Sequence, residues 1–175
     1  MGRPFSFPFE DHSFDLSWNF CIVEHLKDPI VLADEMKRVS ENYVLFMTQN
    51  FYNIGTIPHL LYHIYQWQGW NHGSFSWMTF SGIKKIARKL ELTVIEEGVI
   101  DVPPWPDTWD MPVRGVFKRG MESAGKSWNW STLTSLAKGS EPSPLIKKVE
   151  YFERLPLPKM LKLPFTHHLY VLCEI

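Results

Sequence analysis

Residues 7–29 read FPFEDHSFDLSWNFCIVEHLKDP, and this stretch decides the fold class. Between residues 14 and 20, apolar and polar side chains alternate, which predicts a short strand. Asp28 is a favourable helix N-cap, and Pro29 suits the first helical position, where its missing N–H costs nothing. The stretch therefore predicts a strand, a short connection and the start of a helix.

The residues that follow complete a strand–helix–strand unit. Leu32, Met36 and Val39 form one apolar stripe at helical spacing. We interpret residues 40–42, Ser-Glu-Asn, as a polar turn. The unbroken apolar run over residues 43–47 is typical of a strand covered on both faces, as in a parallel sheet.

The rest of the chain predicts a second helix and two more strands. Ser81 is suited to cap a helix whose apolar stripe is Ile83, Ile86, Ala87 and Leu90. Residues 92–100 predict a strand, and residues 169–175 predict another that follows without a clear crossover helix. We therefore expect an α/β fold with a mostly parallel sheet and a last strand that runs antiparallel.

Composition limits the possible functions. The chain has 175 residues, which suits one domain, and a formal net charge of −1, which makes nucleic acid a poor partner. No apolar run approaches the roughly 20 residues needed to cross a bilayer. Cys21 and Cys173 lie far apart in apolar sequence and are predicted to be reduced, so we expect a cytoplasmic protein.

The quoted stretch resembles class I S-adenosylmethionine-dependent methyltransferases of the Rossmann-like, small-molecule type. The matching residues, in order, are Pro8, Phe9, Phe14, Asp15, Glu24, His25 and Leu26. The resemblance covers roughly residues 5–100 and, more loosely, 166–175. It implies that residues 14–20 are the family's fourth strand and that the chain is a single partial domain holding the fourth to seventh strands, the C-terminal half of the fold.

Within that partial domain, 1–175, the sequence pattern and the resemblance together predict five segments, of which 101–165 matches nothing in the family. They are the strand–helix–strand unit 1–50, a lid-like aromatic insertion 51–80 with helix around 57–67, the helix and strand 81–100, an irregular insertion 101–165 and the last strand 166–175.

Two features of the family are missing from this sequence. A Gly-Gly turn usually precedes the fifth strand, where this chain has residues 40–42. The Gly-rich cofactor loop and the acidic residue that binds ribose hydroxyls have no counterpart, because Gly115, Gly120 and Gly125 do not follow a predicted strand. The resemblance thus implies S-adenosylmethionine as cofactor, and we expect the main cofactor loop to belong to a missing N-terminal half.

The resemblance also implies roles for six residues near the cofactor. It places Phe7, Pro8 and Phe9 beside the adenine ring. It places Asn19, Phe20 and Cys21 near the methionine end, although the same three residues also suit plain packing at a strand end.

His25 is the candidate catalytic residue, as a general base. The alternative, which we favour, is that the Glu24–His25 pair begins a helix and orients the loop before it. Methyl transfer from a sulfonium mainly requires alignment and exclusion of water, so the lack of a catalytic triad does not argue against an enzyme.

The aromatic insertion is the candidate substrate region. The resemblance implies a substrate lid here, formed by Asn50, Tyr52, His72, Trp77 and Phe80, and the aromatic content favours a small or apolar acceptor. The same aromatic side chains also suit a purely structural role in holding the insertion down.

Two other segments of the chain invite a functional reading. His59 and His63 are four residues apart and, with His72, suit a metal site, but no Cys or carboxylate accompanies them, so we predict none. Residues 155–165 mix lysines with apolar residues and prolines, which favours an extended strap packed on the body.

Two functions remain open at this point. One is methyl transfer to a small or apolar acceptor, and the other is a non-catalytic scaffold that binds a partner. In either case the strand over residues 14–20 has an unpaired edge, which invites another chain. We expect a homodimer, or the missing N-terminal half, to cover that edge.

Overall fold

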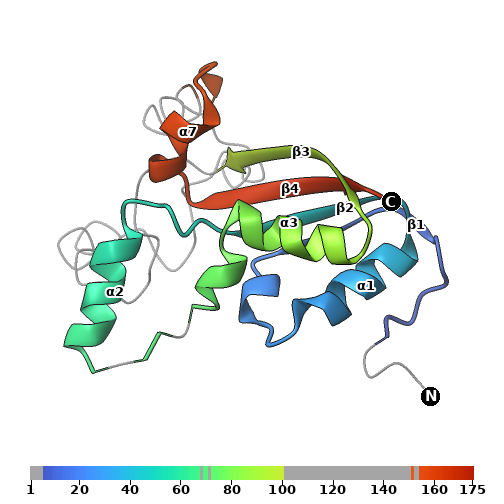
Figure 1. Cartoon of the computed structure of the whole chain (residues 1–175), viewed down its shortest axis with the longest axis horizontal. Coiled ribbons are helices and arrows are strands. Elements are labelled where there is room, and N and C mark those ends of the chain that lie inside the picture. The colour runs from blue at the N-terminus through green and yellow to red at the C-terminus, as the bar shows by residue number, and fades with distance from the viewer. Residues whose placement is uncertain (1–5, 68, 71, 101–150, 152–153) are drawn as a thin grey trace, which may run out of the picture.

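The computed structural model describes residues 6–67, 69, 70, 72–100, 151 and 154–175. The first 100 residues contain β1 (Phe14–Phe20), the 3-10 turn η1 (Val23–His25), α1 (Pro29–Val39), β2 (Ser40–Gln49), α2 (Thr56–Tyr65), η2 (Phe75–Trp77), α3 (Phe80–Lys89) and β3 (Thr93–Ile100). The C-terminal part contains α7 (Lys159–Lys162), η4 (Leu163–Phe165) and β4 (His168–Glu174) (Figure 1).

The described strands form one four-stranded sheet in the order β1-β2-β4-β3. β1 and β2 are parallel, whereas β4 is antiparallel to both β2 and β3. The predicted antiparallel last strand is therefore confirmed, but the prediction of a mostly parallel sheet is wrong. The reason is that β4 lies between two strands, so a single reversed strand produces two antiparallel pairings.

The β1–α1–β2 unit forms as its sequence predicts, apart from the turn. Asp28 caps α1 by accepting a hydrogen bond from the Ile30 N–H at 3.1 Å, and Pro29 is the first helical residue. The predicted turn at residues 40–42 is instead the beginning of β2, because Ser40 pairs with Phe14 across the ladder. Its hydroxyl donates a hydrogen bond to the Met36 carbonyl, so the helix passes directly into the strand.

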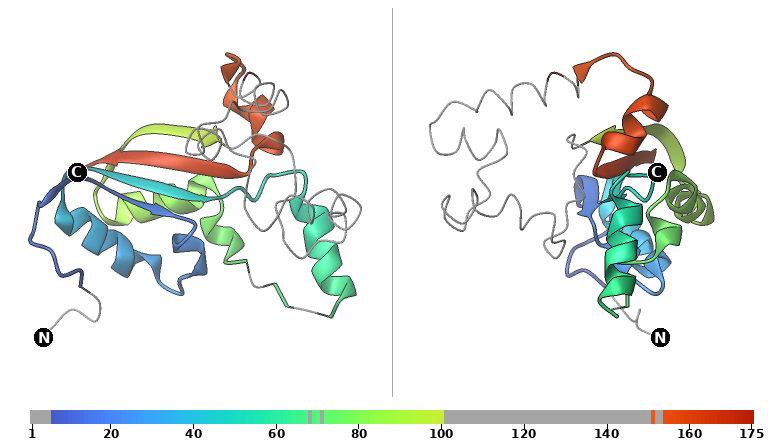
Figure 2. Two further views of the ribbon diagram at one scale, coloured as in Figure 1. Left: turned by 180° about the vertical axis from the view of Figure 1, so that it is seen from behind. Right: turned by 90° about the vertical axis from the view of Figure 1, so that its left-hand side faces the viewer.

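α1 and α3 pack against the same face of the sheet (Figure 1, Figure 2). The side chains buried between them come from the central strands and the two helices and include Val44, Phe46, Ile83, Ile86, Leu169 and Val171. α3 begins two residues earlier than predicted, because Thr79, not Ser81, accepts the capping hydrogen bond from the Gly82 N–H at 3.1 Å. One closed hydrophobic layer results.

The opposite face of the sheet is open along β1. Leu16, Trp18 and Phe20 are all exposed, Trp18 to 62%. β1 is also an edge strand of the sheet. Parallel strands are normally covered on both faces, so this exposed apolar row is the largest departure of the described sheet from that pattern.

The insertion and the C-terminal segment differ from the expectation in detail. α2 projects beyond the end of the sheet (Figure 2). The predicted extended strap contains a one-turn helix, α7, confined between Pro158 and Pro164 because proline cannot continue a helix. The rest of the predicted irregular insertion, residues 101–150, lies outside the described residues.

Candidate functional site

The candidate site lies at the edge of the sheet where β1 and β2 end. Because β1 and β2 are parallel, their carboxyl ends meet at this edge, which is where open α/β sheets bind ligands. β4 runs the other way and therefore begins at the same edge. The rings of Phe20 and His168 pack there with centroids 4.6 Å apart.

Asn19 is the buried polar residue at this edge. Its side chain is 3% exposed, and its amide group contacts the Met36 sulfur at 3.9 Å. Its Oδ1 has no hydrogen-bond partner among the residues that the structure describes. Buried hydrogen-bond acceptors in proteins nearly always have a partner. The Asn19 Oδ1 atom is therefore the position at this edge where a ligand could donate a hydrogen bond.

Cys21 turns the chain out of β1. Its φ is +51°, a conformation uncommon for residues other than glycine, and its N–H donates a hydrogen bond to the Met47 carbonyl at 2.9 Å. Such backbone strain gathers at functional sites. The turn places the following residues, η1, beside the end of β2.

Glu24 connects three segments of the chain. It is 1% exposed, and its Oε1 accepts a hydrogen bond from the Gln49 N–H at 3.3 Å. Its carbonyl accepts another from the Ser74 N–H at 2.7 Å. Gly73 lies so close that a Cβ there would be 2.8 Å from the Glu24 carbonyl oxygen, and its φ is +103°. Glu24 therefore anchors the insertion to the end of β2, which favours a structural role for it.

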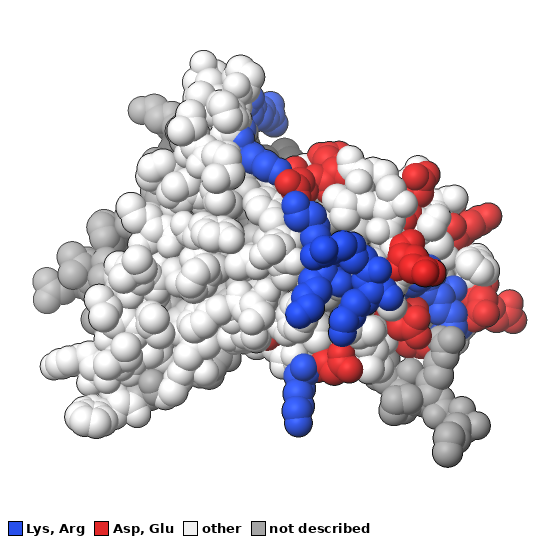
Figure 3. Space-filling model, viewed as in Figure 1, with Lys and Arg blue, Asp and Glu red and all other residues white. Residues whose placement is uncertain are grey.

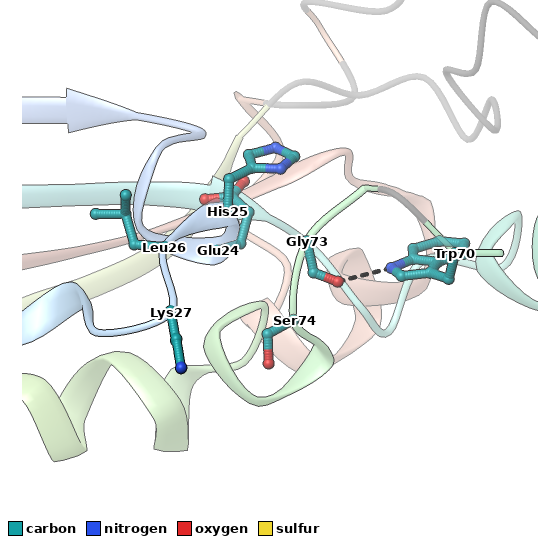
Figure 4. A pocket seen from close by; sticks show the side chains of 7 residues that line it. All are labelled: Glu24, His25, Leu26, Lys27, Trp70, Gly73 and Ser74. Atoms are coloured by element: carbon teal, nitrogen blue, oxygen red, sulfur yellow. Dashed lines mark hydrogen bonds between the residues drawn. The ribbon is translucent and has the colours of Figure 1, made fainter.

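His25 is exposed and lines a pocket of about 360 Å³. One wall comes from η1 and the residues after it, and the other comes from Trp70, Gly73 and Ser74 of the insertion (Figure 4). The Trp70 indole N–H donates a hydrogen bond to the Gly73 carbonyl at 2.7 Å and so fixes the second wall. The pocket lining is Glu24, His25, Leu26, Lys27, Trp70, Gly73 and Ser74.

The predicted cofactor residues fall into two groups. Asn19, Phe20 and Cys21 lie together at the carboxyl end of β1. Phe9 packs edge-on against Phe14 at the amino end of the same strand, with ring centroids 5.0 Å apart.

Phe7 stays with Phe9 on that side. Its N–H donates a hydrogen bond to the Glu35 carboxylate at 3.0 Å, and Arg38 donates one to its carbonyl. A seven-residue strand, about 20 Å long, separates Phe7, Pro8 and Phe9 from the other group.

The predicted substrate residues are also not brought into one cluster. The Asn50 amide group donates hydrogen bonds to the Leu163 and Thr166 carbonyls at 2.6 and 2.9 Å, which fixes the start of the insertion. Trp77 and Phe80 pack against the hydrophobic core. Tyr52 is exposed, and His72 lies beside two other histidines of the insertion.

The sequence analysis missed the roles of Trp70, Gly73 and the buried Glu24. The sequence does contain one signal of an uncharged surface in this region. No Asp, Glu, Lys or Arg occurs between Asn42 and Ile83. Figure 3 shows the consequence, since charged side chains gather over α3 and the neighbouring β3 and leave the surface around α2 without charge. An uncharged wall suits an apolar ligand better than an ionic one.

The comparison with protein families gives one match. Residues 2–46 match the model of a family described as a methyltransferase domain. This confirms the predicted resemblance to class I methyltransferases for the segment that contains β1, α1 and most of β2. No curated protein matches the chain closely enough to be called a relative.

Solved methyltransferase structures resemble the fold at low identity. They include the complex of the Haloferax volcanii Trm112 methyltransferase activator with a methyltransferase (TM-score 0.47, 12% identity, 97% of this chain and 57% of that one). Another is Haemonchus contortus phosphoethanolamine N-methyltransferase 2 with S-adenosyl-L-methionine (TM-score 0.45, 17% identity, 96% and 34%). A third is a SAM-dependent methyltransferase from Archaeoglobus fulgidus (TM-score 0.40, 12% identity, 95% and 62%).

These likenesses are too distant to carry an inference about activity. The chain spans between a third and two thirds of the length of these structures.

Among the described residues, no helix combines the length and the apolar character that a membrane span needs.

Proposed function

We propose that this chain is the acceptor-side half of an S-adenosylmethionine-dependent methyltransferase. The observation that supports the proposal best is the buried Asn19 at the carboxyl end of β1, inside the segment that matches a methyltransferase domain. In an open α/β sheet this edge is where a ligand binds.

The residues at this edge fit the methionine part of the cofactor. Asn19 Oδ1 is a buried acceptor without a partner among the described residues, and the ammonium group of a methionine moiety is a donor in need of one. Phe20 and Cys21 follow Asn19 at the end of the strand, and the Phe20 side chain lies on the opposite, open face of the sheet. When bound, the cofactor supplies an activated methyl group on a sulfonium. Phe7, Pro8 and Phe9 lie at the far end of β1, so we assign them to holding the chain against α1.

The pocket between η1 and residues 70–74 is the proposed acceptor site. It adjoins the carboxyl edge through Glu24, and its second wall belongs to the uncharged insertion. We therefore propose a small or apolar acceptor. The imidazole of His25 lines this pocket and is the proposed base for an acceptor proton.

The exposed apolar face of β1, together with its position at the edge of the sheet, supports the proposal that further strands complete the sheet. Leu16, Trp18 and Phe20 form an exposed apolar row on an edge strand. We propose that a second copy of the chain, or preceding strands and helices, pairs with the edge and covers this row, and the second arrangement also supplies a Gly-rich cofactor loop.

The test is calorimetric titration with S-adenosylhomocysteine, on this chain and on a chain extended at its N-terminus by the upstream coding sequence. We expect binding by the extended chain with micromolar or better affinity. Asn19→Leu, which keeps the branched side chain with the same number of heavy atoms and removes the acceptor, should weaken binding by about tenfold or more.

Ser17→Ala is the matched control for this variant. Ser17 lies two residues earlier on the same face of β1, and its hydroxyl bonds only the Met36 carbonyl among the described residues, at 3.0 Å. The control should bind like the unchanged protein. If neither form of the chain binds the ligand, the enzyme proposal fails and the scaffold alternative stands.

A further inference from the structure

Three histidines that lie apart in the sequence meet inside the insertion. His59 and His63 are on one face of α2, one turn apart, and His72 comes from the loop that follows. The His63 Nε2 atom lies 3.0 Å from the Nε2 atoms of both His59 and His72. His59 and His63 are only 4% and 1% exposed, so the cluster is not a chance contact between mobile surface side chains.

Hydrogen bonding alone does not account for this geometry. An imidazole nitrogen carries either one proton or one lone pair, directed along a single line in the ring plane. At most one of the two contacts of His63 Nε2 is therefore a linear hydrogen bond. The other then brings two nitrogens together without a good donor, which is costly in a buried site.

A shared metal ion does account for it. Three neutral imidazoles that point their lone pairs at one cation need no proton between them, and their nitrogens come close because all are about 2.0–2.1 Å from the ion. For a tetrahedral ion this places the nitrogens about 3.3 Å apart. The ligand atoms of the three histidines all lie within 4.8 Å of one another, with the two Nε2 contacts at 3.0 Å.

The surroundings of the cluster restrain the ligands. The Trp70 ring packs against all three imidazoles, with centroids 5.0 to 5.6 Å away. Trp70 itself is fixed by its hydrogen bond to Gly73 and by Phe75, whose ring centroid is 4.7 Å away. Ligands held in place before binding are what a metal site requires.

The donor set points to zinc. Imidazole suits Zn²⁺ and its neighbours in the first transition row, whereas the absence of thiolate and carboxylate from this set argues against Cu⁺, Mg²⁺ and Ca²⁺. Three protein ligands leave one position of a tetrahedral zinc for a fourth ligand. No Cys or carboxylate lies near these histidines in the sequence, which argues against a metal, but three converging imidazoles are a sufficient ligand set without them.

We propose that His59, His63 and His72 bind one zinc ion, which fastens α2 to the loop 70–74. That loop also forms one wall of the pocket and contacts Glu24 through Ser74. The ion therefore fixes the pocket wall by joining two segments of the insertion. The inference rests on the histidine geometry alone and stands whether or not the chain binds S-adenosylmethionine.

The test is titration of the full chain, first freed of metal with a chelator, with Co²⁺ and then with Zn²⁺. We expect one Co²⁺ per chain, with the intense visible bands of a tetrahedral site, and loss of those bands when one equivalent of Zn²⁺ displaces it. Zinc should also raise the melting temperature, because a ligand that binds only the folded state stabilises it.

Variants locate the site. His63→Gln and His72→Gln should each weaken zinc binding by about 100-fold or more, since even groups that only orient a ligand contribute 10- to 100-fold. His12→Gln is the control, because His12 is exposed and bonds the Ser40 carbonyl far from the insertion. His72→Cys should restore binding and add a sulfur-to-cobalt charge-transfer band.

His72 is half-buried in a loop, so its variants keep the proposal testable if His63→Gln does not fold. The proposal is overturned if the unchanged chain binds no Co²⁺ with a tetrahedral spectrum. It is equally overturned if the His72→Gln and His12→Gln proteins bind zinc as tightly as each other.

Discussion

Residues 14–49 and residues 50–79 of this chain are held in place by different forces. The first region, β1–α1–β2, is built from local signals and buries its apolar stripe against the sheet. The second region has no charged residues and is anchored largely by polar contacts, including those of Asn50 and Asn53 with Thr166. One region folds around a core, and the other is attached to it.

The distances in sequence between contacting residues explain why the regions differ. In the first region, β1, α1 and β2 contact one another within a few tens of residues, and β2 then adds its ladder with the distant β4. In the second, the Ile54 N–H donates to the Pro164 carbonyl at 2.9 Å, and the Asn50 N–H donates to the His167 carbonyl at 2.8 Å. Such contacts form only after the C-terminal segment has docked, so we expect the insertion to open at a lower free energy than the core.

The largest expected effect is on the core of the first region. Phe46 is 0% exposed and lies in β2 between α1, α3 and β4. Phe46→Ala should lower the free energy of unfolding by about 3–5 kcal/mol, because it removes buried apolar area and leaves a cavity. Chemical denaturation measures this, and both regions should lose hydrogen-exchange protection together. Loss confined to residues 50–79 would contradict the assignment of Phe46 to a common core.

A smaller and more local effect is expected at the anchor of the second region. Asn50→Ala removes two buried hydrogen bonds, to the Leu163 and Thr166 carbonyls. Each contributes about 0.5–1.5 kcal/mol, so the expected cost is about 1–3 kcal/mol. Hydrogen exchange should rise in residues 50–79 and in 163–167 while β1 and α1 keep their protection. Equal loss in both regions would show that the insertion is part of the core.

The smallest effect is expected where α7 contacts the sheet. Lys159 and Lys84 both pair with Glu97 of β3, and the hydrogen bond from Lys159 is the main cause of its lowered pKa. A carboxylate whose folded pKa is lowered stabilises the fold above its unfolded value of 4.5, and this contribution is lost as the pH falls through the folded pKa.

Acidification below that value should therefore loosen α7, by less than about 1 kcal/mol because the pair is partly exposed. The measurement is the melting temperature of the unchanged chain and of Lys159→Gln as a function of pH. The variant should show a smaller pH dependence in this range, and identical curves would exclude a role for the ion pair.

Much of the fold could be predicted from short stretches of sequence. Alternation over residues 14–20, the Asp28-Pro29 start of α1 and the apolar stripe of α3 are local patterns, and each gave the right element. The reversed direction of the last strand also followed from the lack of a crossover helix before it. These features are encoded within one or two turns of chain.

The candidate site was predicted less completely. The resemblance implies a cofactor role for Asn19, Phe20 and Cys21, and these residues lie together because they are consecutive at the end of β1. The Asn50 side chain was assigned to a lid, but the structure uses it to bind residues more than a hundred positions away. No local pattern distinguishes an asparagine that binds a substrate from one that satisfies distant carbonyls.

By itself, the sequence determined the β1–α1–β2 unit, the α/β class and the resemblance to a methyltransferase domain, because strand alternation, capping and helical stripes are local properties. The tertiary structure alone decided three things: the insertion of β4 between β2 and β3, the anchoring of residues 50–79 by Thr166, and the convergence of His59, His63 and His72. Each depends on which distant segments become neighbours, and that is set by the packing of the whole sheet.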